Sequence, residues 1–229
     1  MQKINDMNRP VLAVASNEEF AAVSSNSVIR NTYVLLSMTL FFSAITAGVS
    51  MALSLPHPGL LITLGGYFAL LFATSKFRNS GLGIVFVFAL TGFMGYTLGP
   101  LLNMYLALPN GGQTVMTALG ATAVIFLGLS GYALSTQKDF SFLGGFLMVG
   151  ILVAFFAGIG AIFFSMPALS LAVSAMFVLL MSGLILYQTS ELIHGGETNY
   201  IMATVTLYVS IFNLFTSLLH LLGFMSGDD

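Results

Sequence analysis

The chain has 229 residues, of which 57% are hydrophobic and only 6% are charged, and its formal net charge is −2. A globular domain carries about 25% charged residues, so this composition excludes an ordinary soluble domain and indicates a protein whose main solvent is membrane lipid. The few cations form no basic run, which argues against nucleic acid as a partner. The absence of cysteine excludes disulfides, thiolate metal sites and cysteine nucleophiles.

The two ends of the chain are its most polar parts. Residues 1–30 mix acidic, basic and amide side chains and contain no long apolar run. We therefore expect a flexible, water-exposed N-terminal tail, and no cleavable signal peptide. Residues 224–229 end in Asp228-Asp229 and are expected to form a short acidic tail.

Between these tails lie four long segments without Asp, Glu, Lys or Arg. They contain 45 residues after Arg30, 59 after Arg78, 51 after Asp139 and 30 after Glu197. A helix needs about 20 apolar residues to span a membrane, so each of the first three segments has room for two spans and the last has room for one. The count predicts seven membrane-spanning helices.

Prolines divide the three longest segments near their middles, at Pro56, Pro109 and Pro167, and predict a turn at each point. The apolar runs are far longer than the roughly 10-residue strands of a membrane barrel and show no alternation, which excludes that fold. We predict an all-α, seven-transmembrane-helix bundle over residues 31–223. Its expected spans are about 31–54, 59–75, 81–107, 114–136, 142–164, 168–192 and 200–223.

The positive charges predict how the bundle is oriented. With an odd number of spans, the N-terminal tail lies on the same side of the membrane as the second, fourth and sixth connections. All six cations fall on that side, which the positive-inside rule assigns to the cytoplasm. The N-terminus is therefore expected in the cytoplasm and the C-terminus outside. The six cations are Lys3, Arg9, Arg30, Lys76, Arg78 and Lys138.

Small residues recur at spacings that favour close helix packing in lipid. Examples are Gly95-Tyr-Thr-Leu-Gly99, Ala154-Phe-Phe-Ala-Gly158 and the pair Gly144-Gly145.

The third span contains a further feature, Gly99-Pro100. Pro100 cannot donate to the carbonyl of Tyr96, so we expect a kink or partial unwinding there. Two interpretations stay open: a kink that only shapes the bundle, or a broken helix that binds a ligand or an ion.

Polar side chains predict a pocket between the sixth and seventh helices. Gln188, Glu191 and His194 follow one another at three-residue steps at the end of the sixth span. A polar stripe on the seventh must face protein or water. The alternative is a set of interhelical hydrogen bonds that only fix packing. The stripe, at intervals of 4, 3, 4 and 3, consists of Thr206, Ser210, Asn213, Ser217 and His220.

Chemical activity is not indicated by these groups. Glu191, His194 and Glu197 are residue types that bind divalent metals, but Gly195-Gly196 ends the helix before Glu197, so we expect no metal site. Glu191 and His194 could instead take up protons near neutral pH. The chain contains no HExxH motif, phosphate loop or recognisable nucleophile set, and we expect neither an enzyme nor a cofactor.

Several longer motifs resemble the Bax inhibitor-1 family, and more narrowly its YccA branch of bacterial inner-membrane proteins. The resemblance covers the chain from about Arg30 to Gly223 and implies a seven-helix bundle in the inner membrane. The motifs are Arg30-Asn-Thr-Tyr33, Thr91 to Asn103, Lys138 to Gly145, His194 to Ile201 and Leu207 to Phe215.

Two functions are implied by this resemblance. Members of the YccA branch associate with the membrane-anchored, ATP-dependent protease FtsH as slow substrates and modulators, and residues 1–30 would then be the handle that FtsH grips. Other members are described as calcium or proton-linked leak channels, closed by one aspartate in the sixth span and one in the seventh. At those positions this chain has Gln188 and Ser210, which do not titrate. Modulation of FtsH is therefore the expected function, with an ion leak through the pocket as the alternative.

Overall fold

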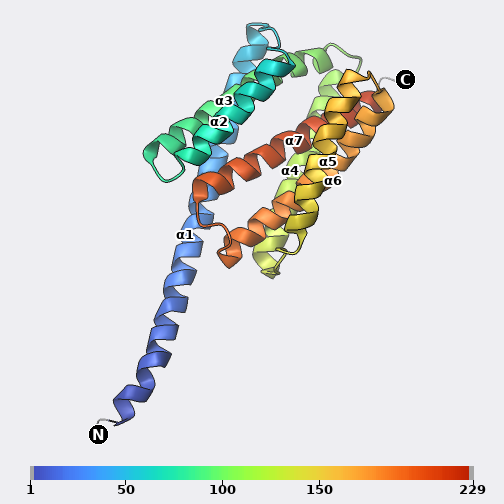
Figure 1. The fold of residues 1–229 in the computed structure, drawn as a ribbon. Helices are drawn as coiled ribbons and strands as arrows, with labels where there is room; N and C mark the ends of the chain where they lie inside the picture. The colour runs from blue at the N-terminus through green and yellow to red at the C-terminus, as the bar shows by residue number, and fades with distance from the viewer. Residues whose placement is uncertain (1–2, 227–229) are drawn as a thin grey trace.

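Seven α-helices make up the structure, a computed structural model that describes the backbone of residues 3–226 and the side chains of residues 26–226 (Figure 1). The predicted all-α fold is confirmed. Six helices are long and apolar enough to cross a membrane, α1 through its segment Asn26–Ala52, whereas α2 is a shorter apolar helix of 17 residues. The helices are α1 (Lys3–Ala52), α2 (Leu60–Lys76), α3 (Gly81–Leu106), α4 (Gly111–Thr136), α5 (Leu143–Phe163), α6 (Pro167–His194) and α7 (Tyr200–Ser226).

The helix ends follow from turn residues. Pro167 occupies the first turn of α6, where its missing N–H costs no hydrogen bond. Gly195 ends α6 in the left-handed conformation, with φ of 76°, which a residue with a side chain rarely adopts. The turns predicted at Pro56, Pro109 and Pro167 are confirmed, because each lies between helices or at a helix start.

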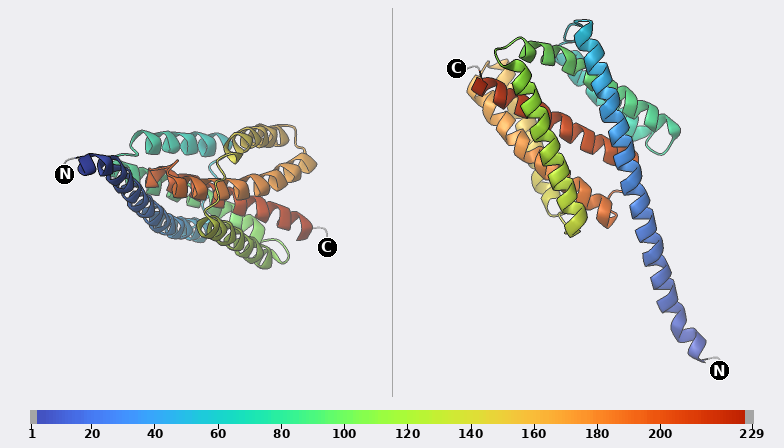
Figure 2. Two further views of the ribbon diagram at one scale, coloured as in Figure 1. Left: turned by 90° about the horizontal axis from the view of Figure 1, so that it is seen from below. Right: turned by 180° about the vertical axis from the view of Figure 1, so that it is seen from behind.

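The N-terminal part of α1 extends away from the other helices (Figures 1 and 2). Its backbone is helical from Lys3, where the sequence predicts a flexible tail. That flexibility stays a prediction, but packing begins earlier than the predicted boundary, because Val28 and Ile29 already contact the core. At the other end α7 continues to Ser226, so residues 224–226 of the expected acidic tail are helical. Residues 227–229 lie outside the described part of the chain.

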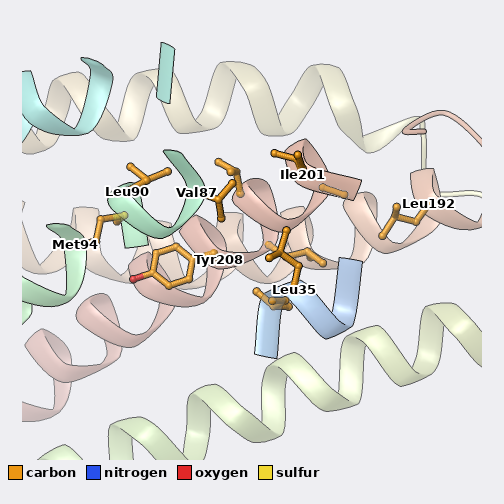
Figure 3. Close-up of a cluster of buried hydrophobic side chains, with 11 residues drawn as sticks. Leu35, Val87, Leu90, Met94, Leu192, Ile201 and Tyr208 are labelled. Carbon is orange, nitrogen blue, oxygen red and sulfur yellow. The ribbon is translucent and has the colours of Figure 1, made fainter. Parts of the chain in front are cut away.

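The last helix, α7, is the centre of the bundle. It contacts α1, α3, α4 and α6, and in Figure 1 and the right-hand view of Figure 2 it lies between the α1–α3 pair and the α4–α6 group. Leu207, Leu214 and Leu219 of α7 are fully buried. One core cluster joins Tyr208 and Ile201 of α7 to side chains of α1 and α3 (Figure 3).

Large apolar side chains cover the outside of the molecule. Leu61 is 86% exposed and Phe164 is 77% exposed, and many others resemble them. Monomeric proteins in water rarely expose contiguous apolar surface on this scale, whereas a bilayer covers it with hydrocarbon. The chain is therefore a polytopic membrane protein.

The predicted packing of small residues is confirmed at α1 and α3. A Cβ atom on Gly95 would collide with the Thr46 side chain and the Ser43 carbonyl, and one on Gly99 would collide with Ser50. Gly144 lies against Tyr187 of α6, as expected, but Gly145 has nothing within 4 Å, so the prediction for that second glycine is wrong.

The second motif, Ala154 to Gly158, also packs against its neighbours: Ala154 is fully buried, and a Cβ on Gly158 would lie 3.5 Å from the Val173 side chain.

The second, fourth and sixth connections meet at one end of the bundle. Asn199 Nδ2 donates to the Arg78 carbonyl at 3.1 Å, which joins the 6–7 connection to the 2–3 connection. His194 Nε2 lies 3.1 Å from the carbonyl of Gln137 in the 4–5 connection. The connections that carry Lys76, Arg78 and Lys138 therefore share one end, as the alternating order of the predicted spans requires.

A glycine replacement tests the α1–α3 contact. We expect Gly99→Ala to destabilise the bundle by about 1–3 kcal/mol, because the added methyl group overlaps Ser50. Gly65→Ala is the matched control, since Gly65 has nothing within 4 Å and alanine favours helix. Thermal unfolding of both purified variants in detergent gives the comparison. Equal midpoints would contradict a close contact at Gly99.

Candidate functional site

A neighbouring helix supplies the hydrogen-bond donor that Pro100 lacks. Pro100 has no N–H to donate to the Tyr96 carbonyl, and Ser50 Oγ of α1 donates to that carbonyl instead, at 2.9 Å. Partial unwinding, one of the two predicted forms of distortion, is wrong, because α3 remains helical from Gly81 to Leu106. A kink at this position stays a prediction. Since Ser50 fills the position that a ligand would need, the geometry favours the packing interpretation of Gly99-Pro100.

Three buried hydroxyl and carbonyl groups join α1, α3 and α7. Tyr208 Oη donates to the Thr91 carbonyl at 3.2 Å and lies 2.6 Å from Ser43 Oγ. A tyrosine hydroxyl has one hydrogen, which Thr91 accepts, so Ser43 is the donor to Tyr208. Tyr208 is 1% exposed, and pairing of this kind removes the cost of burying its hydroxyl.

Hydroxyl groups also connect α6 to its neighbours near the end that carries the cations. Thr189 Oγ1 lies 3.3 Å from Tyr33 Oη of α1 and 3.4 Å from Ser130 Oγ of α4. Ser190 Oγ accepts from the Phe140 N–H at 2.9 Å and donates to the Lys138 carbonyl at 3.2 Å. The 4–5 connection is therefore fixed against the end of α6.

His194 strengthens the same junction. Its Nδ1 lies 2.9 Å from the Ser190 carbonyl and its Nε2 faces Gln137, so each N–H that the ring carries has an acceptor. Asp139 lies nearby and accepts from the Ser141 N–H at 2.8 Å. The pKa of Asp139 is lowered, first by hydrogen bonds from the backbone and side chain of Ser141 and also by the neighbouring His194.

In the described part of the chain, the predicted polar residues of α7 form two hydrogen bonds within their own helix and one to α6, and the pocket between α6 and α7 stays a prediction. Ser210 Oγ and Asn213 Nδ2 donate to carbonyls of α7 itself, at 2.7 and 2.9 Å. His220 Nδ1 bonds Ser174 Oγ at 2.8 Å near the start of α6, at the end of the helix far from His194. Ser217 is buried.

The remaining predicted residues lie on α6. Gln188 is 5% exposed, and its Nε2 is buried without a hydrogen-bond partner among the described residues. Glu191 is half-buried, and its carboxylate lies against Gly196. The proposed roles of these residues stay predictions.

The bundle contains a cavity that lies apart from the predicted pocket between α6 and α7. Its volume is about 500 Å³ and it lies between α1, α3, α4 and α7. None of Gln188, Ser210, Asn213 or His220 lines it. Sequence reasoning missed it, and it also missed Thr189, Ser190, Ser43 and Tyr208. Of these four residues only Tyr208 lies within a family-like motif, Leu207 to Phe215.

Seven apolar helices, with hydroxyl and carbonyl groups bonded between α1, α3 and α7, define the class of protein: a polytopic membrane protein. The family described as inhibitor of apoptosis-promoting Bax1 matches residues 25–227. The chain belongs to this Bax inhibitor-1 family, and the resemblance is confirmed.

Individual relatives are similar over nearly their whole length. The Escherichia coli protein named modulator of FtsH protease YccA is 54% identical over 214 residues, 93% of this chain and 97% of that protein. An uncharacterized protein of Pseudomonas aeruginosa is 54% identical over 217 residues, 95% of this chain and 96% of its own. A membrane protein of Vibrio cholerae is 44% identical over 224 residues, 97% of this chain and 100% of its own.

A double-mutant cycle tests the compensation at Pro100. Ser50→Ala removes the donor to the Tyr96 carbonyl and should cost about 1–3 kcal/mol of unfolding free energy. In a Pro100→Ala background the same change should cost less, because residue 100 then supplies the missing N–H. Unfolding in mixed detergent micelles measures both costs, and Ser37→Ala, which alters a bond within α1, is the control. If Ser50→Ala costs the same free energy of unfolding in the wild-type and in the Pro100→Ala background, Ser50 does not compensate for the missing N–H of Pro100.

Proposed function

We propose that this chain is an inner-membrane protein that binds the FtsH protease and modulates its activity. The observation that carries the proposal is the 54% identity to the E. coli modulator of FtsH protease, which extends over 97% of that protein. A second E. coli relative with the same identity is named inner membrane protein YccA, which supports the location. The proposed action is association with a protease and not a reaction of the chain's own.

The form of the molecule suits an interaction with a membrane-anchored unfoldase. The N-terminal part of α1 extends beyond the bundle (Figure 1). Val28 and Ile29 contact the core, and the proposed handle is the segment of α1 that precedes them. An ATP-driven protease needs such a segment on its own side of the membrane before it can pull.

The alternative, an ion leak between α6 and α7, has less support. Ser210 and Asn213 donate within α7, and Gln188 and Ser210 carry no titratable group at the two gate positions that the family resemblance indicates. A conducting path needs polar groups that face a continuous passage. Ser174 and His220 bond to each other across the contact between α6 and α7.

Orientation is the first test. With seven spans, including the short α2, reporter fusions should place Lys76, Lys138 and the segment 194–198 in the cytoplasm, because the cations gather on that side. A fusion after Asp229 should report the outside. A cytoplasmic C-terminus would contradict the seven-span topology and would identify a helix that does not cross, with α2 as the first suspect.

The second test separates folding from degradation. Deletion of residues 2–25 leaves Val28 and Ile29 in place and should therefore leave the bundle folded. If the deleted segment is the handle, the protein should persist much longer in cells with active FtsH. The stabilised protein should then occupy FtsH and slow the breakdown of its other membrane substrates in proportion to its abundance.

Half-lives after translation is blocked provide the measurement, for the chain itself and for an unrelated FtsH substrate. In cells whose FtsH cannot cleave, the full-length and shortened forms should have equal half-lives. Unchanged turnover of the unrelated substrate, despite abundant and inserted shortened protein, would contradict the proposal.

The third test concerns ions. In liposomes the wild-type protein should show little calcium flux that switches near neutral pH, because Gln188 and Ser210 cannot titrate. A Gln188→Asp, Ser210→Asp variant should acquire pH dependence if a passage exists, since paired buried carboxylates titrate above their ordinary range. Strong, pH-switched flux from the wild type would favour the leak and would direct attention to Glu191 and His194.

A further inference from the structure

The cavity between α1, α3, α4 and α7 opens sideways, between α1 and α4. Ala44 and Gly48 of α1 and Leu119, Ala123 and Leu127 of α4 line it and are exposed. The two helices are separated enough that α1 and α4 form no backbone contact among the described residues. The opening is therefore a gap between two membrane-spanning helices.

The inner wall of the cavity comes from α3 and α7. Tyr208 and Phe215 of α7 line it and are buried, and Leu98 and Leu102 of α3 are half-buried beside them. Gly48 at the opening has nothing within 4 Å of its Cβ position, so the cavity is unfilled there.

The few polar atoms at the cavity are already paired. Tyr208 Oη donates to the Thr91 carbonyl and accepts from Ser43, and Thr122 Oγ1 donates to the Ala118 carbonyl at 2.7 Å. All the other side chains that line it are apolar. A hydrated ion or polar solute would lose its hydrogen bonds on entry and gain none, which excludes it on energetic grounds. An apolar molecule has no hydrogen bonds to lose on entry.

The depth of the cavity in the membrane determines which apolar molecule can reach it. Ala123 lies near the middle of α4 (Gly111–Thr136), and Phe212 lies near the middle of α7 (Tyr200–Ser226). At that depth the surrounding solvent is the hydrocarbon of the bilayer. A volume of about 500 Å³ lies within the range of about 300–1,000 Å³ typical of ligand sites.

We propose that this cavity is a lipid site that takes an acyl chain of a membrane phospholipid through the gap between α1 and α4. The chain packs against Tyr208, Phe212 and Phe215 and occupies apolar space that water cannot fill favourably. Neither the sequence motifs nor the proposed binding of FtsH assigns this site.

The chain contains no tryptophan, so a single one reports on one position. Phe212→Trp places it in the cavity, Phe72→Trp on a side chain of α2 that is 70% exposed, and Phe88→Trp on a half-buried side chain of α3 outside the cavity. Each protein is reconstituted into vesicles of phosphatidylcholine that is brominated on its acyl chains. Bromine quenches tryptophan only at short range, so loss of emission measures access of acyl chains.

We expect emission at Phe212→Trp to fall nearly as far as at Phe72→Trp, and clearly further than at Phe88→Trp. Adding Gly48→Phe should relieve the quenching at Phe212→Trp, because the new ring fills the opening. The matched control is Gly65→Phe, a mid-span glycine of α2 with equally open surroundings, and it should change nothing.

Each of the following outcomes would overturn the proposal. Quenching at Phe212→Trp no stronger than at Phe88→Trp would show that acyl chains do not enter. Quenching that Gly48→Phe leaves unchanged, or that Gly65→Phe relieves equally, would show that they do not enter by this opening. Quenching by aqueous iodide would show a water-filled vestibule, and quenching by neither agent would show a cavity closed by a second copy or another helix.

Discussion

The contact between α1 and α3 is the constraint on which the other arrangements depend. Gly95 and Gly99 let the α1 backbone approach α3 so closely that any side chain in their place would collide with Ser43, Thr46 or Ser50. In hydrocarbon no hydrophobic force drives helices together, and close backbone approach supplies the packing attraction instead. The approach also brings hydroxyl groups of α1 within reach of α3 and α7.

These hydroxyl groups form hydrogen bonds with buried polar groups that lipid cannot bond. A carbonyl without a partner costs several kcal/mol in a membrane, since no water is present to bond it. Ser50 bonds the Tyr96 carbonyl that Pro100 leaves without a donor, and Ser43 bonds the Tyr208 hydroxyl. The proline in α3 is therefore tolerated because α1 lies close enough to compensate for it, and α7 is joined to the same pair of helices.

Charge and proline positions were sufficient to predict the helices, because in lipid a long segment without charge has few alternatives to a helix. The seven predicted spans match α1 to α7 to within a few residues at most ends. The helical backbone of residues 3–30 was not predicted, since their composition has neither an apolar stripe nor a membrane-length run. The close approach at Gly95 and Gly99 was predicted from spacing alone.

The polar pocket shows why a site is harder to predict than a span. The spacing of polar residues shows that they share one face of a helix, but it does not show which residues of the neighbouring helix they lie against. Because α6 and α7 run in opposite directions, His194 lies near the start of α7, while His220 bonds Ser174 near the start of α6. Thr189 and Ser190 gave no distinctive signal, since such hydroxyls usually bond their own helix. The cavity depends on a gap between α1 and α4 that no local pattern encodes.

The distribution of polar groups connects the structure to the proposed mode of action. Family members share a fold, but function depends on the residues that each places at a site. Here the paired hydroxyls of Ser43 and Tyr208 hold helices together, and the cavity beside them opens toward lipid instead of along the membrane normal. A bundle arranged in this way offers neither a charged gate nor a polar passage at these positions. The proposed interaction with a membrane-anchored protease would use its lipid-facing surface and the extended start of α1.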